Sequence, residues 1–302
     1  LGDVYKRQVP DHRLAVCSTG TIGDRLRNDL VASGIGEAAR AMSPTAGTDF
    51  AEAIRTTDRF AKSGAFLLRF AGGGQVTIGA AAKGAGMIRP TMATMLAFIT
   101  TDARVDADDL SRLTAEAAAA SFNQISVDGQ MSPSDTLLVL ASGAGALGPG
   151  SGPLRDDNLR RFGAALRAVC RWLAIQMVKD GEGAEHAVRL RVIGAADPAE
   201  AKAVVRAVGE SSLFRTAVFG RDPNWGRVAQ AVGAALAGAG GQVHNPEVRL
   251  DGVASADADA AAVMERSEYD IEVALNRGGS SAELWVSDLG YEYVRINAEY
   301  TT

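Results

Sequence analysis

The stretch Lys83–Leu96, KGAGMIRPTMATML, carries two glycines, a lysine and a proline ahead of an apolar run that one hydroxyl interrupts, that of Thr94. Two local structures fit this run. One is a helix that begins at Pro90 and gathers apolar side chains on one face, namely Met92, Met95, Leu96 and Ile99. The other is a buried strand over residues 95–101, which are few and rich in β-branched and aromatic types. By pattern alone, Thr94 is an ordinary packed residue in either structure.

Short apolar runs alternate with longer periodic ones along the chain, which predicts an α/β fold with helices covering sheets. Strands are predicted at residues 13–18, 65–70, 75–80, 136–141 and 186–193, with a hairpin turn at Gly72 to Gly74. Helices are predicted at residues 110–120, 159–177 and 224–239. From Glu247 to Asn297 the pattern returns to β-rich alternation, and residues 142–153 are loop-like enough to mark a boundary.

That loop spells G-x-G-x-x-G through Gly143, Gly145 and Gly148, the fingerprint of a dinucleotide-binding turn. Such a turn must open a helix whose N-terminus meets the phosphates, whereas prolines and glycines follow here. A nucleotide site is therefore not predicted.

Composition narrows the function classes further. The 302 residues are 47% apolar and 22% charged, with a formal charge of −5 and a pI near 5.4, which argues against a nucleic-acid partner. No apolar run reaches the ~18 to 20 residues of a membrane span, and no signal-peptide layout opens the chain, so we expect a cytoplasmic protein. Cys17 and Cys170 lack paired spacing and the three histidines lack metal-ligand spacing, so neither a disulfide framework nor a metal site is predicted.

Several long blocks together carry a family resemblance. KGAGMIRPTMATMLAFITTDA at residues 83–103 closely resembles the signature of the ornithine acetyltransferase family, the bifunctional glutamate/ornithine N-acetyltransferases of arginine biosynthesis. The family's other blocks follow in the expected order: STGTIG at 18–23, AEAIRTTD at 51–58, SFNQISVDG at 121–129, GEG at 181–183, FGRDPNWGR at 219–227 and YEYVRINAEYTT at 291–302. The chain departs from the usual pattern at SPSD, Ser132 to Asp135, and at Glu185 and His186 after GEG.

The resemblance implies a layered α/β sandwich of the N-terminal-nucleophile type. It implies that the precursor cuts itself between Ala93 and Thr94, giving an α chain that contains residues 9–93 and a β chain of residues 94–302, assembled as α2β2. The freed amine of Thr94 would then act as general base for its own hydroxyl, because a free α-amino group titrates near ~7.7 to 8.0.

The implied activity is that of a glutamate N-acetyltransferase. N-acetylornithine would acylate Thr94, ornithine would leave, and glutamate would take the acetyl group to form N-acetylglutamate. No metal or bound cofactor is implied, and acetyl-CoA is left open as a co-substrate.

The resemblance also assigns site residues. The Thr19 hydroxyl and the Gly20 N–H would form the oxyanion hole. Lys83 suits a substrate carboxylate and Glu182 an ammonium group. The remaining implied substrate contacts are Thr94, Asn297, Thr302 and one of Thr56 and Thr57, which the pattern does not separate.

The first eight residues, LGDVYKRQ, resemble a translated sequencing adapter, so we expect residues 1–8 to be non-native and an upstream family section to be missing. Three alternatives stay open. One is an N-terminal-nucleophile amidase or aminopeptidase, in which water resolves the acyl-enzyme. Another is a non-catalytic remnant of the scaffold, and the third is a relative with a different acyl acceptor.

Overall fold

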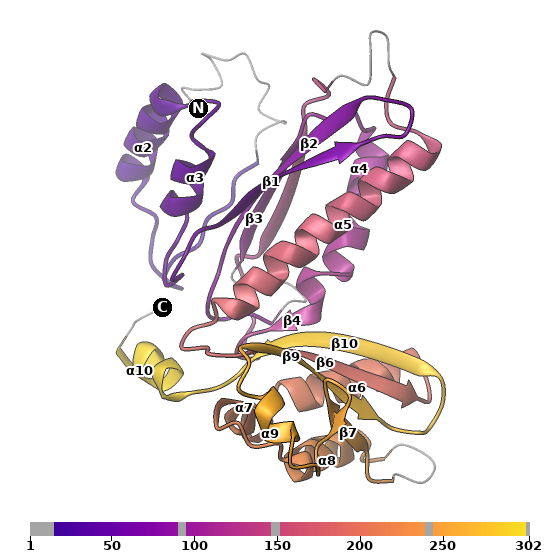
Figure 1. The fold of residues 1–302 in the computed structure, drawn as a ribbon. Coiled ribbons are helices and arrows are strands. Elements are labelled where there is room, and N and C mark those ends of the chain that lie inside the picture. Colours follow the sequence, from indigo (N-terminus) through magenta and orange to yellow (C-terminus); the bar gives the residue numbers. More distant parts are fainter. Residues whose placement is uncertain (1–14, 90–94, 146–151, 239–243, 300–302) are drawn as a thin grey trace.

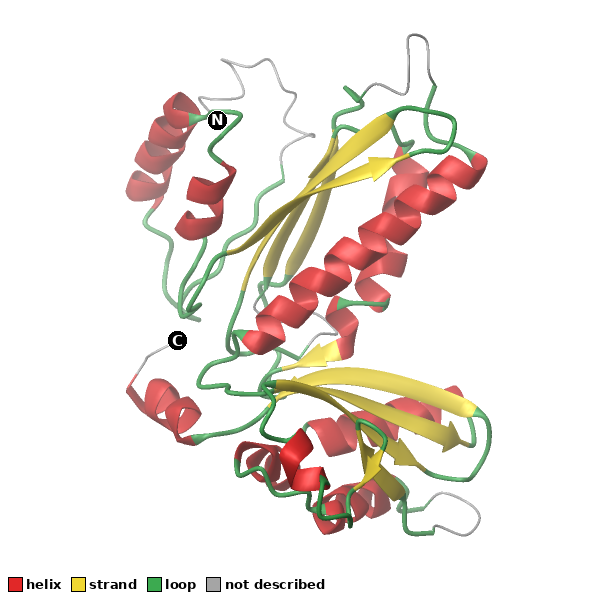
Figure 2. Cartoon of the chain, in the orientation of Figure 1, coloured by secondary structure: helices red, strands yellow, loops and turns green. Residues whose placement is uncertain are grey.

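The computed structural model describes residues 15–89, 95–145, 152–238 and 244–299, which form two β-sheets with helices packed against them (Figure 1). Helices and strands alternate along the described chain (Figure 2), and the predicted α/β class is confirmed. The predicted adapter residues 1–8 lie outside the described residues.

The first sheet has four strands in the order β1-β2-β3-β5. Their bounds are β1 Lys62–Arg69, β2 Gln75–Lys83, β3 Leu96–Thr101 and β5 Thr136–Ala141. β1 and β2 form the predicted antiparallel hairpin, whose turn uses the left-handed backbone of Gly73 and Gly74. β3 runs parallel to β5, with Leu96 opposite Thr136. The strand interpretation of residues 95–101 is therefore right from Leu96 onward, and the helix interpretation is wrong.

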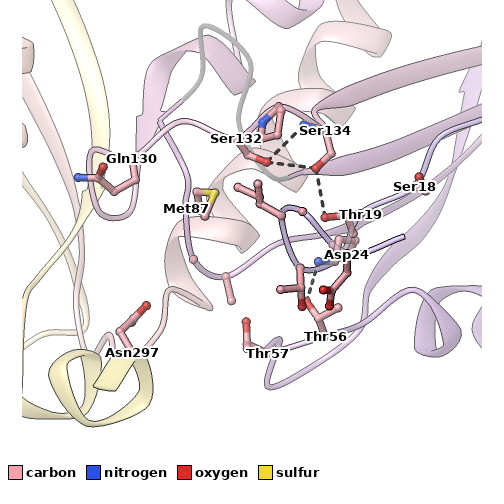
Figure 3. A pocket seen from close by; sticks show the side chains of 18 of the residues that line it. Ser18, Thr19, Asp24, Thr56, Thr57, Met87, Gln130, Ser132, Ser134 and Asn297 are labelled. Atoms are coloured by element: carbon pink, nitrogen blue, oxygen red, sulfur yellow. Dashed lines mark hydrogen bonds between the residues drawn. The ribbon is translucent and has the colours of Figure 1, made fainter. Parts of the chain in front are cut away.

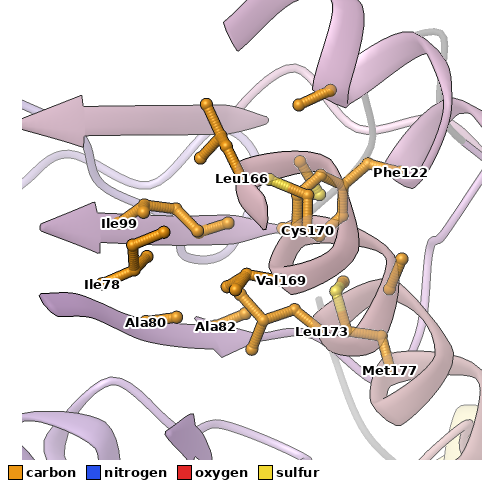
Figure 4. Packing of buried hydrophobic residues seen from close by; sticks show 14 of the residues in the cluster. Ile78, Ala80, Ala82, Ile99, Phe122, Leu166, Val169, Cys170, Leu173 and Met177 are labelled. Carbon is orange, nitrogen blue, oxygen red and sulfur yellow. The ribbon is translucent and has the colours of Figure 1, made fainter. Parts of the chain in front are cut away.

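Helix α5, Asp156–Lys179, lies across this sheet beside α4, Ala107–Ala119. The predicted apolar stripe of α5 is buried against β2 and β3, as Figure 4 shows for Leu166, Val169, Leu173 and Met177. Each such side chain contributes about 1.5–3 kcal/mol on burial, which makes this contact a main source of stability for the first sheet.

The second sheet has six strands in the order β4-β10-β6-β9-β7-β8 and forms a separate apolar core. The strands are β4 Ile125–Ser126, β6 Ala187–Ala195, β7 Glu247–Leu250, β8 Val253–Ala254, β9 Glu268–Ala274 and β10 Ser280–Ser287. Helices α6, Pro198–Gly209, and α8, Trp225–Ala235, supply buried residues to this core. Asn224 caps α8 by accepting the Arg227 N–H, in keeping with the predicted helix start.

The remaining elements are α2 Asn28–Ala41, α3 Gly47–Ala53, the 3-10 turn η2 Phe122–Gln124, α7 Ser212–Phe219, α9 Ala260–Val263 and α10 Tyr291–Glu299.

Two secondary-structure predictions fail. Residues 15–18 are irregular instead of a strand, because no neighbouring strand pairs with them and Val16 is 93% exposed. The β pattern expected through Asn297 ends at Ser287, and α10 follows it. In the G-x-G-x-x-G segment, Gly143 and Gly145 lie outside any helix, Gly148 lies outside the described residues, and the next described helix, α5, begins at Asp156.

Candidate active site

A pocket of about 520 Å³ opens where the N-terminal segment, the end of β2, the turn after α5 and helix α10 meet. Among the predicted site residues, seven line it: Thr19, Gly20, Thr56, Thr57, Lys83, Glu182 and Asn297. The other three, Ala93, Thr94 and Thr302, lie outside the described residues. The structure thus gathers side chains from the two ends of the described chain around one cavity (Figure 3).

Lys83 is the last residue of β2 and is only 2% exposed. Its Nζ donates a hydrogen bond to Thr56 Oγ1 at 2.6 Å. Burial lowers the pKa of Lys83, and the negative charges of Asp58 and Glu182 partly offset that effect. The lysine therefore provides a cation at the pocket wall, and its hydrogen bond distinguishes Thr56 from Thr57, which also lines the pocket.

Glu182 supplies the opposite charge from the turn that follows α5. Its Oε2 accepts a hydrogen bond from Asn297 Nδ2 on α10 at 2.9 Å. Gly86 leaves room for this carboxylate, because a Cβ there would overlap both Glu182 oxygens. Gly183 has a φ of +70°, and a Cβ there would overlap the backbone of Tyr293. Gly86 thus makes room for the Glu182 carboxylate, and Gly183 allows α10 to pack closely over this turn.

The predicted oxyanion residues belong to the irregular segment 15–20. Ser134 Oγ donates to Thr19 Oγ1 at 3.1 Å and lies 3.1 Å from Ser132 Oγ (Figure 3). Because Thr19 accepts this bond, its own hydroxyl hydrogen stays available to another acceptor. Sequence reasoning assigned no role to either serine.

Asp128 also lines the pocket. Its carboxylate accepts the N–H groups of Met87 at 2.5 Å and Ile88 at 3.0 Å, which fixes the loop after β2. Met87 has a φ of 53°, a backbone conformation that side chains other than glycine rarely adopt. Asp128 belongs to the quoted block SFNQISVDG. An Asp-Gly pair is typical of a turn, and this pair is the one local sign in the sequence that Asp128 lies in a loop.

A buried ion cluster lies behind Lys83 and Thr56. Lys62 Nζ is fully buried and contacts Asp58 Oδ1 at 2.6 Å and Asp180 Oδ2 at 2.5 Å. Asp58 also accepts the N–H groups of Gly84 at 2.7 Å and Thr56 at 3.1 Å. Burial acts to raise the pKa of Asp58, but Lys62 and these hydrogen bonds outweigh it, and the pKa lies below its ordinary value. The cluster therefore fixes the backbone at Thr56 and at Gly84, the residue after Lys83.

The substitutions after GEG lie away from the pocket lining. Glu185 is exposed, and the buried ring of His186 pairs through Nδ1 with Asp288 Oδ2 at 2.8 Å.

Among the residues that the structure describes, no group of three or more His, Cys, Asp or Glu side chains could hold a metal ion. Cys17 and Cys170 are both free thiols. Within the same described ranges, every helix is too short or too polar to cross a membrane.

Comparisons with known proteins agree with this geometry. A family model described as the ArgJ family matches residues 4–302. The "Arginine biosynthesis bifunctional protein ArgJ" of Symbiobacterium thermophilum is 45% identical over 96% of this chain and 73% of its own length. The protein of the same name from Geobacter sulfurreducens is 41% identical over 97% of this chain and 76% of its own length.

The crystal structure of the "Arginine biosynthesis bifunctional protein argJ" from Bacillus halodurans superposes with a TM-score of 0.59 at 32% identity. The match covers 67% of this chain and 98% of the crystallised chain. The expected N-terminal-nucleophile sandwich fold is confirmed. Sequence blocks, fold and pocket agree with one another, and the chain belongs to the ArgJ family.

Proposed function

We propose that this chain is a self-cleaving glutamate N-acetyltransferase of arginine biosynthesis, acting in the cytoplasm. It moves the acetyl group of N-acetylornithine to glutamate through an acetyl-Thr94 intermediate. The observation that carries the proposal is the convergence of seven family-implied residues on one pocket, with a cation, Lys83, and an anion, Glu182, both on its wall.

The two charges suit the substrates. N-acetylornithine presents an α-carboxylate and a side-chain ammonium, and a pocket with Lys83 and Glu182 pairs both at once. Asn297 orients Glu182 through its 2.9 Å hydrogen bond, and Thr56 orients Lys83. The same cation serves a carboxylate of glutamate in the second half-reaction. Binding of this kind places the acetyl group at a defined point of the pocket.

The chemistry proceeds as acyl transfer. The Thr94 oxygen attacks the acetyl carbonyl while its proton passes to the α-amine of the same residue. The Thr19 hydroxyl and the Gly20 N–H donate to the oxygen that gains negative charge, an effect worth roughly 10²- to 10³-fold per donor in comparable sites. Ornithine leaves, and the glutamate amine resolves the acetyl-enzyme in a ping-pong cycle. No bound cofactor takes part, and acetyl-CoA is a second acetyl donor to be tested.

The family resemblance also implies the chain organisation. An α chain ends at Ala93 and a β chain begins at Thr94, and two such pairs form an α2β2 assembly. The crystallised relative supports this division, because the matched crystal chain is about two thirds as long as this one, as is the segment from Thr94 to the end.

The test combines intact mass with product analysis. The purified protein should give two fragments, the second beginning at Thr94, while Thr94→Ala stays uncut. Incubation with N-acetylornithine and glutamate should then give ornithine and N-acetylglutamate in equal amounts. Free acetate without N-acetylglutamate would identify a hydrolase, and an uncut, inactive wild type would refute the proposal. Acetyl-CoA replaces N-acetylornithine in a parallel assay.

A further inference from the structure

Asp135 immediately precedes β5, and Met95 immediately precedes the neighbouring strand β3. Its Oδ1 accepts the Met95 N–H at 2.8 Å, and the N–H of the next residue, Thr136, donates to the Met95 carbonyl at 2.9 Å. These two bonds continue the parallel register in which Leu96 faces Thr136. The Asp135 carboxyl thus binds the backbone N–H of Met95, the residue that directly follows the proposed nucleophile Thr94 in the sequence.

The second oxygen of Asp135 has no donor. Oδ2 is shielded from solvent and has no hydrogen-bond partner within the described part of the chain. A buried acceptor in this state costs roughly 1–3 kcal/mol, so such atoms usually face a group that completes them. Burial raises the pKa of Asp135 to about 7, against the opposing effect of the Met95 N–H.

The titratable side chains of the adjoining pocket do not supply that donor. They are Asp24, Arg25, Arg27, Lys83, Asp128, Glu182 and Tyr293. Among the described residues, none of them forms a hydrogen bond or an ion pair with Asp135. The preceding residues Ser132, Pro133 and Ser134 line the pocket, so Asp135 stands directly next to its wall.

We propose that Asp135 binds the α-amino group that self-cleavage creates at Thr94, with Oδ2 as the acceptor and Oδ1 held by the Met95 N–H. This inference rests on the proposed function. Asp135 is then a fixed anion beside the α-amine of Thr94, which is the base of the reaction. It is a positioning residue, because it acts on the Thr94 hydroxyl only through that amine.

The proton balance is as follows. When the Thr94 oxygen bonds to the acetyl carbon, the hydroxyl proton moves to the α-amine, which becomes an ammonium. The Asp135 carboxylate stabilises that ammonium by a charge-assisted hydrogen bond. When the tetrahedral intermediate collapses, the carbon–nitrogen bond to ornithine breaks and the ammonium returns its proton to the departing amine.

The experiment compares Asp135→Asn with Asp135→Glu, which keeps the charge, and with Asp102→Asn as a matched control. Asp102 also accepts a backbone N–H, that of Thr77 at 2.7 Å, but does not line the pocket. The readouts are self-cleavage by intact mass and the pH profile of kcat/KM for acetyl transfer. The wild type is measured in parallel.

Removing a neighbouring carboxylate lowers the pKa of an ammonium. We therefore expect the acid limb of the Asp135→Asn profile to move down by at least about one pH unit, with kcat reduced at least about tenfold. Asp135→Glu should keep the acid limb, and Asp102→Asn should match the wild type. An acid limb that does not move in an active Asp135→Asn enzyme would overturn this inference and leave the proposed function intact. An uncut wild type would overturn both.

A measurement on the wild type covers the case in which the Asp135 variants do not fold. Reductive ¹³C-methylation of the cleaved protein, followed by an NMR titration, gives the pKa of the Thr94 α-amine. A carboxylate partner should hold it above the ordinary range of about 7.7–8.0, and a value below that range refutes the contact.

Discussion

Replacing Lys62 by methionine should destabilise the protein strongly through charge alone. Both partners of Lys62, Asp58 and Asp180, have fully buried side chains. Methionine keeps most of the apolar stem, so packing changes little while the ammonium is lost. The two carboxylates then remain in the interior without their shared cation.

The structure sets the size of the effect. Removing one partner of a buried ion pair typically costs about 3–5 kcal/mol, because the remaining charge stays desolvated. For a chain of this length that corresponds to a fall in Tm on the order of 10 °C. Since Asp58 also holds the backbone of Thr56 and Gly84, kcat/KM for acetyl transfer should fall as well.

The pH dependence identifies the cause. The pKa of Asp58 lies below its ordinary value in the fold, so its contribution to stability is present above about pH 4 and is lost as pH falls through the folded-state pKa. The free-energy gap between the wild type and Lys62→Met should therefore be full at pH 7. It should close in acid as the carboxyls become protonated.

Denaturant unfolding measured from pH 7 down to about pH 2 follows the gap as it closes, with exposed Lys202→Met as the matched control. The triple variant Lys62→Met, Asp58→Asn, Asp180→Asn should recover part of the loss, because it removes the charges together. If Lys62→Met is no less stable at pH 7 than Lys202→Met, the argument from buried charge is refuted.

Two further predictions concern the turn beneath α10. Glu182→Gln removes the anion at the pocket wall, so the KM for N-acetylornithine should rise at least about tenfold, whereas exposed Glu185→Gln should leave it unchanged. Steady-state kinetics on both variants decides this, and equal KM values would remove Glu182 from substrate binding. Gly183→Ala should lower the free energy of unfolding by about 1–3 kcal/mol, because its φ is +70° and the added Cβ meets the Tyr293 backbone. Gly233→Ala in α8, where a Cβ meets nothing, should instead stabilise slightly, and similar effects of the two changes would contradict the proposed packing of α10.

Hydrophobic periodicity is a local property, and it predicted the strands β1, β2, β5 and β6 and the helices α4, α5 and α8. It did not predict the helices α2, α3, α6 and α7. The stripe of α5 and the limits of β5 follow from it directly. It failed at residues 15–18, where an alternating pattern has no neighbouring strand to pair with. Pocket residues such as Lys83 and Glu182 were predicted through the family blocks, and composition alone would have made both solvated surface groups.

Contacts between distant segments could not be predicted in this way. Lys62 resembles an ordinary polar residue at a strand end, and its burial depends on Asp180, which follows a helix 118 residues later. Ser134 bonds to Thr19, 115 residues away, only because the segment with Thr19 returns across the pocket. No local pattern contains either pairing.

The pair Met95 and Asp135 shows most clearly what sequence lacks. Residues 136–141 were predicted as a strand, and residues 95–101 as a strand or a helix. A parallel pairing needs a crossover, and nothing in either segment states which partner it takes. Once β3 and β5 are neighbours with Leu96 opposite Thr136, the residues before them must also be adjacent. Asp135, the last residue of SPSD, thereby becomes the proposed anion beside the Thr94 amine. The register of one strand pair, more than any single motif, leads from the fold to the chemistry of the nucleophile.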